Sequence, residues 1–287
     1  MDNYLRVEDT NFPANKHLRL KDKLFDLSKP KVMGILNCTP DSFYSESRFN
    51  TKPSILNQVE KFISEGVDII DVGGYSTRPG AIEISIQEEI SRVLPVIQCI
   101  KNEFSDIPIS LDTFRSEVAK IGLENGIDII NDISAWNLDH ELLSVISHYK
   151  CPYILMHMKG EPSTMQKNTY YENIFNSIIS FLSEKLKVLK EHGINDVIID
   201  PGFGFGKTLE QNYEILNKIE DFKMLGKPIL VGISRKSMIY NKLNSDASSS
   251  LNGTTILNTI AISKGASILR VHDVKEAKEV IELLNIF

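Results

Sequence analysis

The segment DPGFGFGKT, residues 200–208, places a carboxylate, three glycines and a lysine directly after an apolar run. The Gly-Lys-Thr ending also occurs in the phosphate-binding loop of nucleotide hydrolases, which needs another glycine five positions before the one that precedes the lysine. Counting five positions back from Gly206 gives Pro201, so the spacing excludes such a loop. Lys207 is therefore expected on the exposed start of a helix, where its replacement by alanine would matter little.

Polar residues also follow the other apolar runs of the chain. In order, the eight runs span residues 31–37, 67–74, 107–113, 127–134, 152–158, 196–202, 228–234 and 266–273. Their polar ends carry carboxylates at Asp112 and Asp200, amides at Asn37 and Asn131, and cations at Lys236 and Arg270. Singly, each residue has an ordinary interpretation as a helix cap, a turn residue or a solvated charge. Together they suit a ligand with a donor-rich edge at one end and an anion at the other.

Two of these side-chain types indicate a particular ligand chemistry. A carboxylate can accept two parallel hydrogen bonds from an N–H and an amino group, which the guanidine-like edges of pterins and guanines offer. Arg270 and His272 are two residues apart, so on a strand they point the same way and can clamp one ligand group. His157 lies between two methionines and is interpreted as a hydrogen-bonded core histidine. No HExxH, Cys/His cluster or Ser-His-Asp pattern supports a zinc site or a serine hydrolase.

The elements that must position these residues repeat along the chain. Each apolar run precedes a segment of helical periodicity, least clearly after the seventh, where residues 244–253 interrupt the pattern. Eight such units predict an α/β fold, a single closed (β/α)8 TIM barrel, with a doubly wound open sheet as the alternative. Residues 1–30 are expected to form an N-terminal extension, a β-hairpin that closes the barrel bottom, before a barrel domain of residues 31–287.

Composition narrows the class of protein further. The formal net charge of −6 disfavours nucleic acid as a partner, because phosphate backbones are held by concentrated Lys and Arg. The three cysteines form no CxxC pair, which favours reduced thiols in a cytoplasmic protein over disulfides. The amino terminus is polar and charged, with neither a signal peptide nor a membrane-spanning run, so no membrane partner is expected.

Motifs at these strand ends resemble those of the dihydropteroate synthase family. They are GILNCTPDSFY (34–44), DVGGYSTRPGA (71–81), SLDTFRSEVA (110–119), NDISA (131–135), LMHMKG (155–160), DPGFGFGK (200–207), GISRKSMI (232–239) and LRVHDV (269–274). Their order and number make chance agreement remote. Cys38 departs from the pattern, because the family more often has an apolar residue such as valine there, and residues 1–30 carry no family signature.

The resemblance implies a folate-biosynthesis transferase that joins p-aminobenzoate to 6-hydroxymethyl-7,8-dihydropterin diphosphate in an SN1-like reaction, with Mg²⁺ as cofactor. It also implies a homodimer and a sulfonamide target. By position, the implied pterin residues are Asp112, Asn131, Ile133, Met156, Asp200, Lys236 and Arg270. The implied diphosphate residues are Asn37, Thr77, Arg78, Arg270 and His272, with Asn37 also at the metal. The implied p-aminobenzoate residues are Phe43, Pro79, Phe205, Ser234 and Lys236, and the catalytic ones are Asp41, Arg78, Lys236 and Arg270.

Two alternatives stand beside this interpretation. A pterin-barrel methyltransferase acting on methyltetrahydrofolate would share the barrel and some pterin-binding acids, but would not need Arg78, Arg270 and His272 for a diphosphate. A pterin-binding homologue without catalysis is disfavoured by the intact segments around Asp41 and Arg78. Under the synthase interpretation, Lys236 is indispensable.

Overall fold

A closed barrel of parallel strands forms the centre of the molecule. The computed structural model describes residues 16–38, 51–76 and 83–285. The barrel strands are β3 (Lys31–Asn37), β4 (Ile69–Gly73), β5 (Ile109–Asp112), β6 (Ile129–Asp132), β7 (Tyr153–Met156), β8 (Val197–Asp200), β9 (Leu230–Val231) and β10 (Ile268–Val271). They pair in the order β8-β7-β6-β5-β4-β3-β10-β9, and a single parallel bridge between Ile199 and Ile229 joins the two ends of the sheet. The predicted barrel is confirmed, and the open-sheet alternative is wrong.

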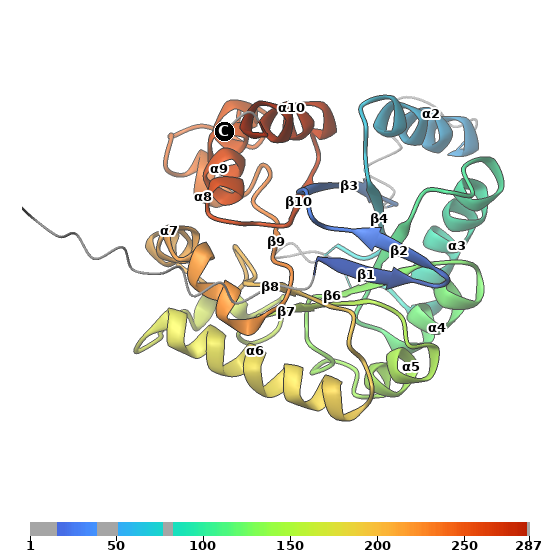
Figure 1. The fold of residues 1–287 in the computed structure, drawn as a ribbon, viewed down its shortest axis with the longest axis horizontal. Helices are drawn as coiled ribbons and strands as arrows, with labels where there is room; N and C mark the ends of the chain where they lie inside the picture. Colours follow the sequence, from blue (N-terminus) through green and yellow to red (C-terminus); the bar gives the residue numbers. More distant parts are fainter. Residues whose placement is uncertain (1–15, 39–50, 77–82, 286–287) are drawn as a thin grey trace, which may run out of the picture.

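Helices surround the barrel and alternate with its strands (Figure 1). They are α2 (Thr51–Ser64), α3 (Ile86–Glu103), α4 (Ser116–Glu124), α5 (Glu141–Tyr149), α6 (Ile174–Glu191), α7 (Leu209–Asn217), α8 (Ser237–Tyr240), α9 (Leu251–Ser263) and α10 (Val274–Leu284), with 3-10 turns η1 (Met165–Lys167) and η2 (Ile219–Leu225). The helical period places one apolar side toward the barrel, as in α6, where Ile178 and Leu182 are fully buried. No helix within the described ranges is long and apolar enough to cross a membrane.

The seventh strand–helix unit is interrupted, as the sequence indicates. Residues 241–250 separate α8 from α9. Within them, the Asp246 carboxylate accepts hydrogen bonds from the Ser248 hydroxyl and the Ser249 backbone N–H. Such side-chain bonds to nearby groups compete with helix formation. Arg235 also donates to the Ser248 carbonyl, so side-chain hydrogen bonds help to hold the second half of this connection.

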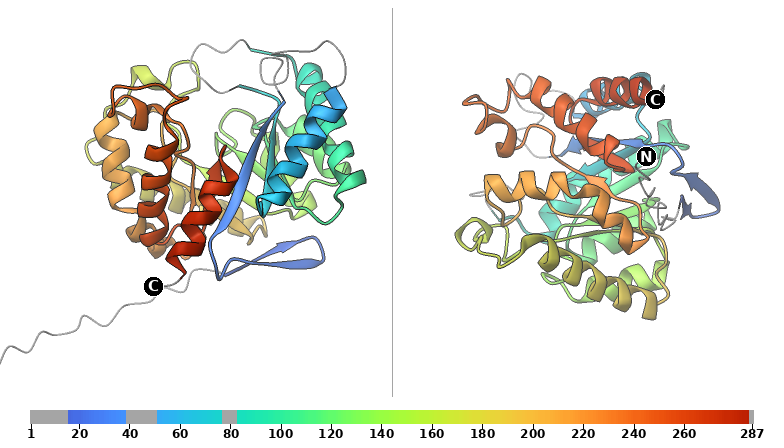
Figure 2. Two further views of the ribbon diagram at one scale, coloured as in Figure 1. Left: turned by 90° about the horizontal axis from the view of Figure 1, so that it is seen from above. Right: turned by 60° about the vertical axis from the view of Figure 1, so that its left-hand side comes forward.

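The barrel interior is apolar at the amino ends of its strands. The inward side chains there form one cluster, made of Met33, Ile69, Ile129, Ile154, Ile198, Leu230 and Ile268. An antiparallel hairpin of β1 (His17–Leu20) and β2 (Lys23–Asp26) adds Leu18 and Leu20 to this cluster. The hairpin lies at the end of the barrel where β3 begins (Figure 2, left). The predicted hairpin at the barrel bottom is confirmed, and the carboxyl ends of the strands are left for polar residues.

Candidate functional site at the carboxyl ends of the strands

Arg270 of β10 joins two carboxylates inside the barrel. Its Nε donates to Oδ2 of Asp71 on β4 at 2.6 Å, and its Nη2 donates to Oδ2 of Asp112 on β5 at 2.5 Å. Asn131 of β6 donates to the same oxygen of Asp71 at 3.1 Å. Asp71 is 0% exposed, so its charge is tolerated only because it is paired and hydrogen-bonded. The structure thus brings together Arg270, Asp112 and Asn131, as predicted.

The two carboxylates keep free hydrogen-bonding capacity. Burial raises the pKa of Asp112 and the Asp71 charge raises it further, while the Arg270 guanidinium lowers it. Asp112 gives one oxygen to Arg270. Oδ1 of Asp71 is buried and accepts no hydrogen bond from the described residues. Because buried polar atoms are almost always satisfied, this oxygen indicates a place where a ligand or a water molecule donates.

Asp200, at the end of β8, and Lys236, after β9, form the second charged part of the site. The Gly202 N–H donates to Oδ1 of Asp200 at 2.7 Å. Nζ of Lys236 donates to the Phe203 carbonyl at 2.6 Å and lies 4.8 Å from the centre of the Phe205 ring. Burial raises the pKa of Asp200, which Lys236 opposes, and burial lowers the pKa of Lys236 to about 8, which Asp200 opposes. The two groups therefore stabilise each other's charged form.

An apolar wall stands beside these charges. Ile133 after β6 and Met156 at the end of β7 belong to one buried cluster, against which Phe205 packs. The other members of the cluster and the side chains packed on it are Met158, Met165, Phe114 and Leu138. We call this cluster the apolar wall. The polar groups beside it form the polar floor, namely Asp71, Asp112, Asn131, Asp200, Lys236 and Arg270. A polar floor next to an apolar wall suits a flat heterocycle that carries hydrogen-bonding groups on its edge.

Of the remaining predicted residues, the structure describes Ser234, His272 and Asn37. Oγ of Ser234 lies 3.0 Å from Nδ1 of His272, and the His272 backbone N–H donates to the same hydroxyl at 3.2 Å. Asn37 ends β3, the neighbour of β10 in the sheet. Five predicted residues lie outside the described ones, namely Asp41, Phe43, Thr77, Arg78 and Pro79.

Asp71 is a site residue that the sequence analysis missed. Its position along β4 could have revealed it. Side chains two residues apart on a strand share a face, and Ile69, two residues before Asp71, lies in the interior cluster. A carboxylate on the inner face of a barrel strand needs a cationic partner. The inward Arg270 of the last strand is that partner.

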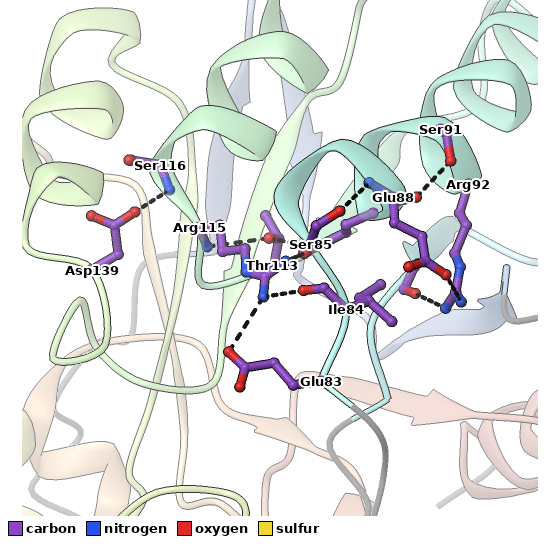
Figure 3. A network of polar contacts seen from close by, with 12 residues as sticks. Glu83, Ile84, Ser85, Glu88, Ser91, Arg92, Thr113, Arg115, Ser116 and Asp139 are labelled. Carbon is purple, nitrogen blue, oxygen red and sulfur yellow. Dashed lines mark hydrogen bonds and ion pairs between the residues drawn. The ribbon is translucent and has the colours of Figure 1, made fainter.

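A second network that the sequence analysis missed fixes the starts of α3 and α4 (Figure 3). Arg115 donates from Nη1 to Oε2 of Glu89 at 3.0 Å and from Nη2 to the Ile84 carbonyl at 2.7 Å. Thr113, which directly follows Asp112, donates to Oε1 of Glu89 at 2.7 Å. Burial raises the pKa of Glu89, and the hydrogen bond from Thr113 and the charge of Arg115 oppose that shift. The network ties the backbone after Asp112 to the segment that enters α3.

The expectation that Lys207 is exposed is wrong. Lys207 is 3% exposed, and its Nζ donates to the carbonyls of Gly202 at 2.7 Å and Phe205 at 2.9 Å. The three glycines of residues 200–208 have φ values of 74°, 83° and 63°, a left-handed conformation that glycine adopts at no steric cost. They turn the chain back on itself. The Lys207 side chain therefore enters this loop instead of reaching solvent from the start of α7.

Known proteins share this sequence and geometry. The pterin binding enzyme family matches residues 33–272. The chain is 43% identical to the dihydropteroate synthase of Synechocystis sp. over 264 residues, covering 91% of each protein. The Yersinia pestis dihydropteroate synthase with a sulfonamide drug has a TM-score of 0.88 and 39% identity, over 94% of this chain and 98% of its own. The Xanthomonas albilineans dihydropteroate synthase with 4-aminobenzoic acid has a TM-score of 0.88 and 32% identity, over 94% and 97%.

A barrel whose carboxyl-end residues combine paired carboxylates, cations and an apolar wall defines a ligand-binding TIM-barrel enzyme. This chain belongs to the pterin binding enzyme family, and the matched relatives within it are dihydropteroate synthases. The resemblance noted in the sequence and the assignment as a transferase of this type are confirmed.

We expect Asp71→Asn to weaken pterin binding by roughly 10- to 100-fold, because Arg270 loses one of its two charged partners and shifts toward Asp112. Isothermal titration with 6-hydroxymethylpterin measures the affinity. Asp68→Asn is the matched control, since Asp68 directly precedes β4, at the barrel bottom, and pairs there with Lys31 and Lys278. The control should lower stability and leave pterin affinity unchanged. Wild-type affinity in Asp71→Asn would remove Asp71 from the site.

The lowered pKa of Lys236 leads to a second prediction. With a folded-state pKa of about 8, the ammonium is charged below that pH and loses its charge and a donor above it. The pterin affinity of the wild type should therefore fall as pH rises through about 8. Lys236→Gln should bind the pterin more weakly at low pH, and its affinity should not show this fall, because glutamine does not titrate. The ratio of the two affinities cancels any titration of the ligand itself. A ratio that stays constant from pH 6 to 10 would contradict a direct contact between Lys236 and the pterin.

Proposed function

We propose that this chain joins p-aminobenzoate to 6-hydroxymethyl-7,8-dihydropterin diphosphate, forming 7,8-dihydropteroate and pyrophosphate. The position of Lys236 carries the proposal. Its ammonium interacts with the Asp200 carboxylate and lies over the Phe205 ring, so the polar floor and the apolar wall share it. Two of the matched structures contain a sulfonamide and 4-aminobenzoic acid, which supports an aniline-binding pocket next to the pterin site.

The floor of the site suits the pterin ring. The N–H and 2-amino groups of a pterin present two parallel donors, which a carboxylate accepts in a bidentate arrangement. Asp200 and Asp112 supply such acceptors, and Lys236 supplies a donor for the ring carbonyl and nitrogen. Ile133 and Met156 belong to the wall on which the flat ring packs. The ring is thereby fixed by its edge and by one face.

The reaction follows from a pterin held in this way. The C–O bond between the exocyclic methylene and the diphosphate breaks, and the electron-rich dihydropterin stabilises the resulting cation. The neutral amine of p-aminobenzoate attacks the methylene carbon, a C–N bond forms, and the nitrogen releases its proton to solvent. No strong base is needed, because an arylamine is unprotonated near neutral pH. The carboxylates beside Arg270 supply negative potential near the cation.

The diphosphate fits beside the polar floor, at the neighbouring carboxyl ends of β3 and β10. We assign it to Asn37, Arg270 and His272, and from the resemblance to Thr77 and Arg78, with Asp41 and Arg78 taking part in catalysis. Mg²⁺ usually takes one or two protein oxygens and fills its other positions with phosphate oxygens and water. The Asn37 amide at the end of β3 fits this need, and the described residues hold no group of three His, Cys, Asp or Glu that would form an all-protein cage. When bound, the ion neutralises charge on the diphosphate.

We further propose that the protein is a cytoplasmic homodimer that pairs through α9 and α10. A groove of about 630 Å³ lies between these helices, lined in part by Leu251, Val280 and Leu283. Ile256 on α9 is 51% exposed and Leu283 on α10 is 64% exposed. Burying such side chains against a second copy is favourable. The cytoplasmic placement is supported by the three free, buried cysteines.

The wild type should release pyrophosphate only when p-aminobenzoate, the pterin diphosphate and Mg²⁺ are all present. A coupled pyrophosphate assay measures this. Asp200→Asn should lower kcat/KM by roughly 30- to 1000-fold, because an acceptor facing two donors becomes partly a donor. Tight pterin binding without pyrophosphate release would indicate the non-catalytic homologue. Demethylation of methyltetrahydrofolate would indicate the methyltransferase, and either result would overturn the proposal.

Light scattering after size-exclusion chromatography should give twice the chain mass of 32.4 kDa for the wild type. Ile256→Asp should give the monomer mass, because a buried, unpaired charge opposes association. Leu24→Asp is the matched control, since Leu24 is 74% exposed on the hairpin at the barrel bottom. A monomeric wild type, or a dimer that survives Ile256→Asp and dissociates with Leu24→Asp, would contradict an interface on α9.

A further inference from the structure

The ammonium of Lys207 is a buried cation that the proposed reaction does not use. Within the described chain its hydrogen-bond partners are the carbonyls of Gly202, Phe205 and His157, at 2.7, 2.9 and 3.2 Å, and Nδ1 of His157 at 3.1 Å. Burial lowers the pKa of Lys207 to about 7, and Asp200 opposes that shift. The three carbonyls can only accept, and an ammonium has three donors, so its contact with Nδ1 of His157 shares a donor with one of the carbonyls. The geometry therefore suits the charged form.

The loop that Lys207 enters depends on side chains for its backbone hydrogen bonds. Residues 201–208 lie between β8 and α7 and belong to no helix or strand. The carbonyls from 202 to 206 accept in turn from Lys207, Lys236, Gln166, Lys207 and Tyr171. Lys207 is the one among these donors that takes two carbonyls of the loop. Its loss would remove the side-chain donor from the first and fourth carbonyls of this run together, leaving the Gly202 carbonyl with the Phe205 N–H.

The loop is also pressed tightly against the segment after β7. A Cβ atom on Gly202 would lie 1.9 Å from the His157 carbonyl oxygen, and one on Gly206 would lie 2.7 Å from the Lys159 carbonyl oxygen. Only glycine therefore fits at these two positions, and the backbone of the loop lies directly on the segment after β7. The Lys207 ammonium joins the two segments, because it donates to the carbonyls of both Gly202 and His157.

His157 completes the site of the ammonium. Burial and the Lys207 charge lower the pKa of His157 to about 2, so its ring is neutral. A neutral ring that accepts at Nδ1 carries its proton on Nε2. The ring also packs edge-on against Phe181 at 5.0 Å between centroids. The interpretation of His157 as a hydrogen-bonded core histidine is thereby confirmed, with Lys207 as its partner.

We propose that Lys207 is a positioning residue of the aminobenzoate pocket, whose ammonium holds residues 202–205 in the turn that sets the Phe205 ring and the Phe203 carbonyl against Lys236. The inference rests on the proposed function, because it assigns the loop a role toward p-aminobenzoate. Lys207 itself contacts neither substrate. It acts through Phe205, which packs on the apolar wall, and through Phe203, which accepts from Lys236.

Lys207→Met, which keeps the aliphatic stem and removes the charge, tests the inference. We expect the KM for p-aminobenzoate to rise about tenfold or more, because misplacement of a binding wall by about 1 Å can cost up to a hundredfold. The dissociation constant for 6-hydroxymethylpterin should stay within about threefold of wild type. Lys190→Met, at an exposed position of α6, is the matched control and should change neither constant. A purely structural role for Lys207 would lower the melting temperature and leave the KM of the folded protein unchanged.

A second measurement does not depend on turnover. In the wild type, the N–H groups of Gly202, Gly204 and Phe205 are hydrogen-bonded to Asp200, Asn212 and Gly202. Hydrogen exchange of the peptide spanning residues 201–208 should be faster in Lys207→Met and unchanged in Lys190→Met. Lys207→Gln, which keeps a neutral donor, should show smaller effects of the same kind and serves if Lys207→Met does not fold.

The two proposals fail in different ways. If the wild type shows no p-aminobenzoate-dependent turnover, the proposed function is wrong, and so is the role of Lys207 toward p-aminobenzoate. The hydrogen-exchange rates still decide in that case whether Lys207 orders the loop. An active wild type, together with a folded Lys207→Met or Lys207→Gln that keeps both the wild-type KM and the wild-type exchange rates, overturns the inference about Lys207.

Discussion

The guanidinium of Arg270 between Asp71 and Asp112 is the interaction on which the site depends. Three charges on inner faces of barrel strands are costly unless they satisfy one another. Their pairing across β10, β4 and β5 permits a polar floor above the cluster of apolar side chains that packs in the lower part of the barrel. The floor still holds more carboxylate than cationic groups, with Asp200 and Lys236 as the third acid and the second cation. A ligand edge rich in donors completes this balance.

The same need for satisfied polar groups shapes the loop after β8. Its carbonyls have no helix or strand to bond them, so lysine, glutamine and tyrosine side chains bond them instead. This arrangement lets the loop adopt a fixed shape that regular structure does not offer, with Phe205 on the apolar wall and Phe203 bonded to Lys236. The floor and the loop therefore meet at Lys236, which interacts with the Asp200 carboxylate and donates to the Phe203 carbonyl.

Most of the fold could be predicted from the sequence, because each strand is an apolar run with a polar end and each helix has its own period. The eight strands lie within the eight runs, and the hairpin lies where expected. Asp71 was missed because an acid inside an apolar run signals nothing until the inner face of the strand and its partner, which is 199 residues away, are known. Lys207 was misplaced because its burial depends on the left-handed conformation of Gly202, Gly204 and Gly206, which the sequence allows but does not require. Roles assigned to Asp41, Phe43, Thr77, Arg78 and Pro79 remain predictions.

The seam between β8 and β9 is the line along which the barrel strands share the least backbone pairing. The backbones of these two strands are joined by a single bridge, at Ile199 and Ile229, whereas the other neighbouring strands form continuous ladders. Beyond that bridge, toward the carboxyl ends of the strands, the Lys236 side chain forms a hydrogen bond to the Phe203 carbonyl across the seam. Along this line, which runs through the pocket itself, the segments that follow β8 and β9 are linked by a side chain and not by a strand ladder. One lysine therefore contributes to the chemistry of the pocket and also joins its two walls.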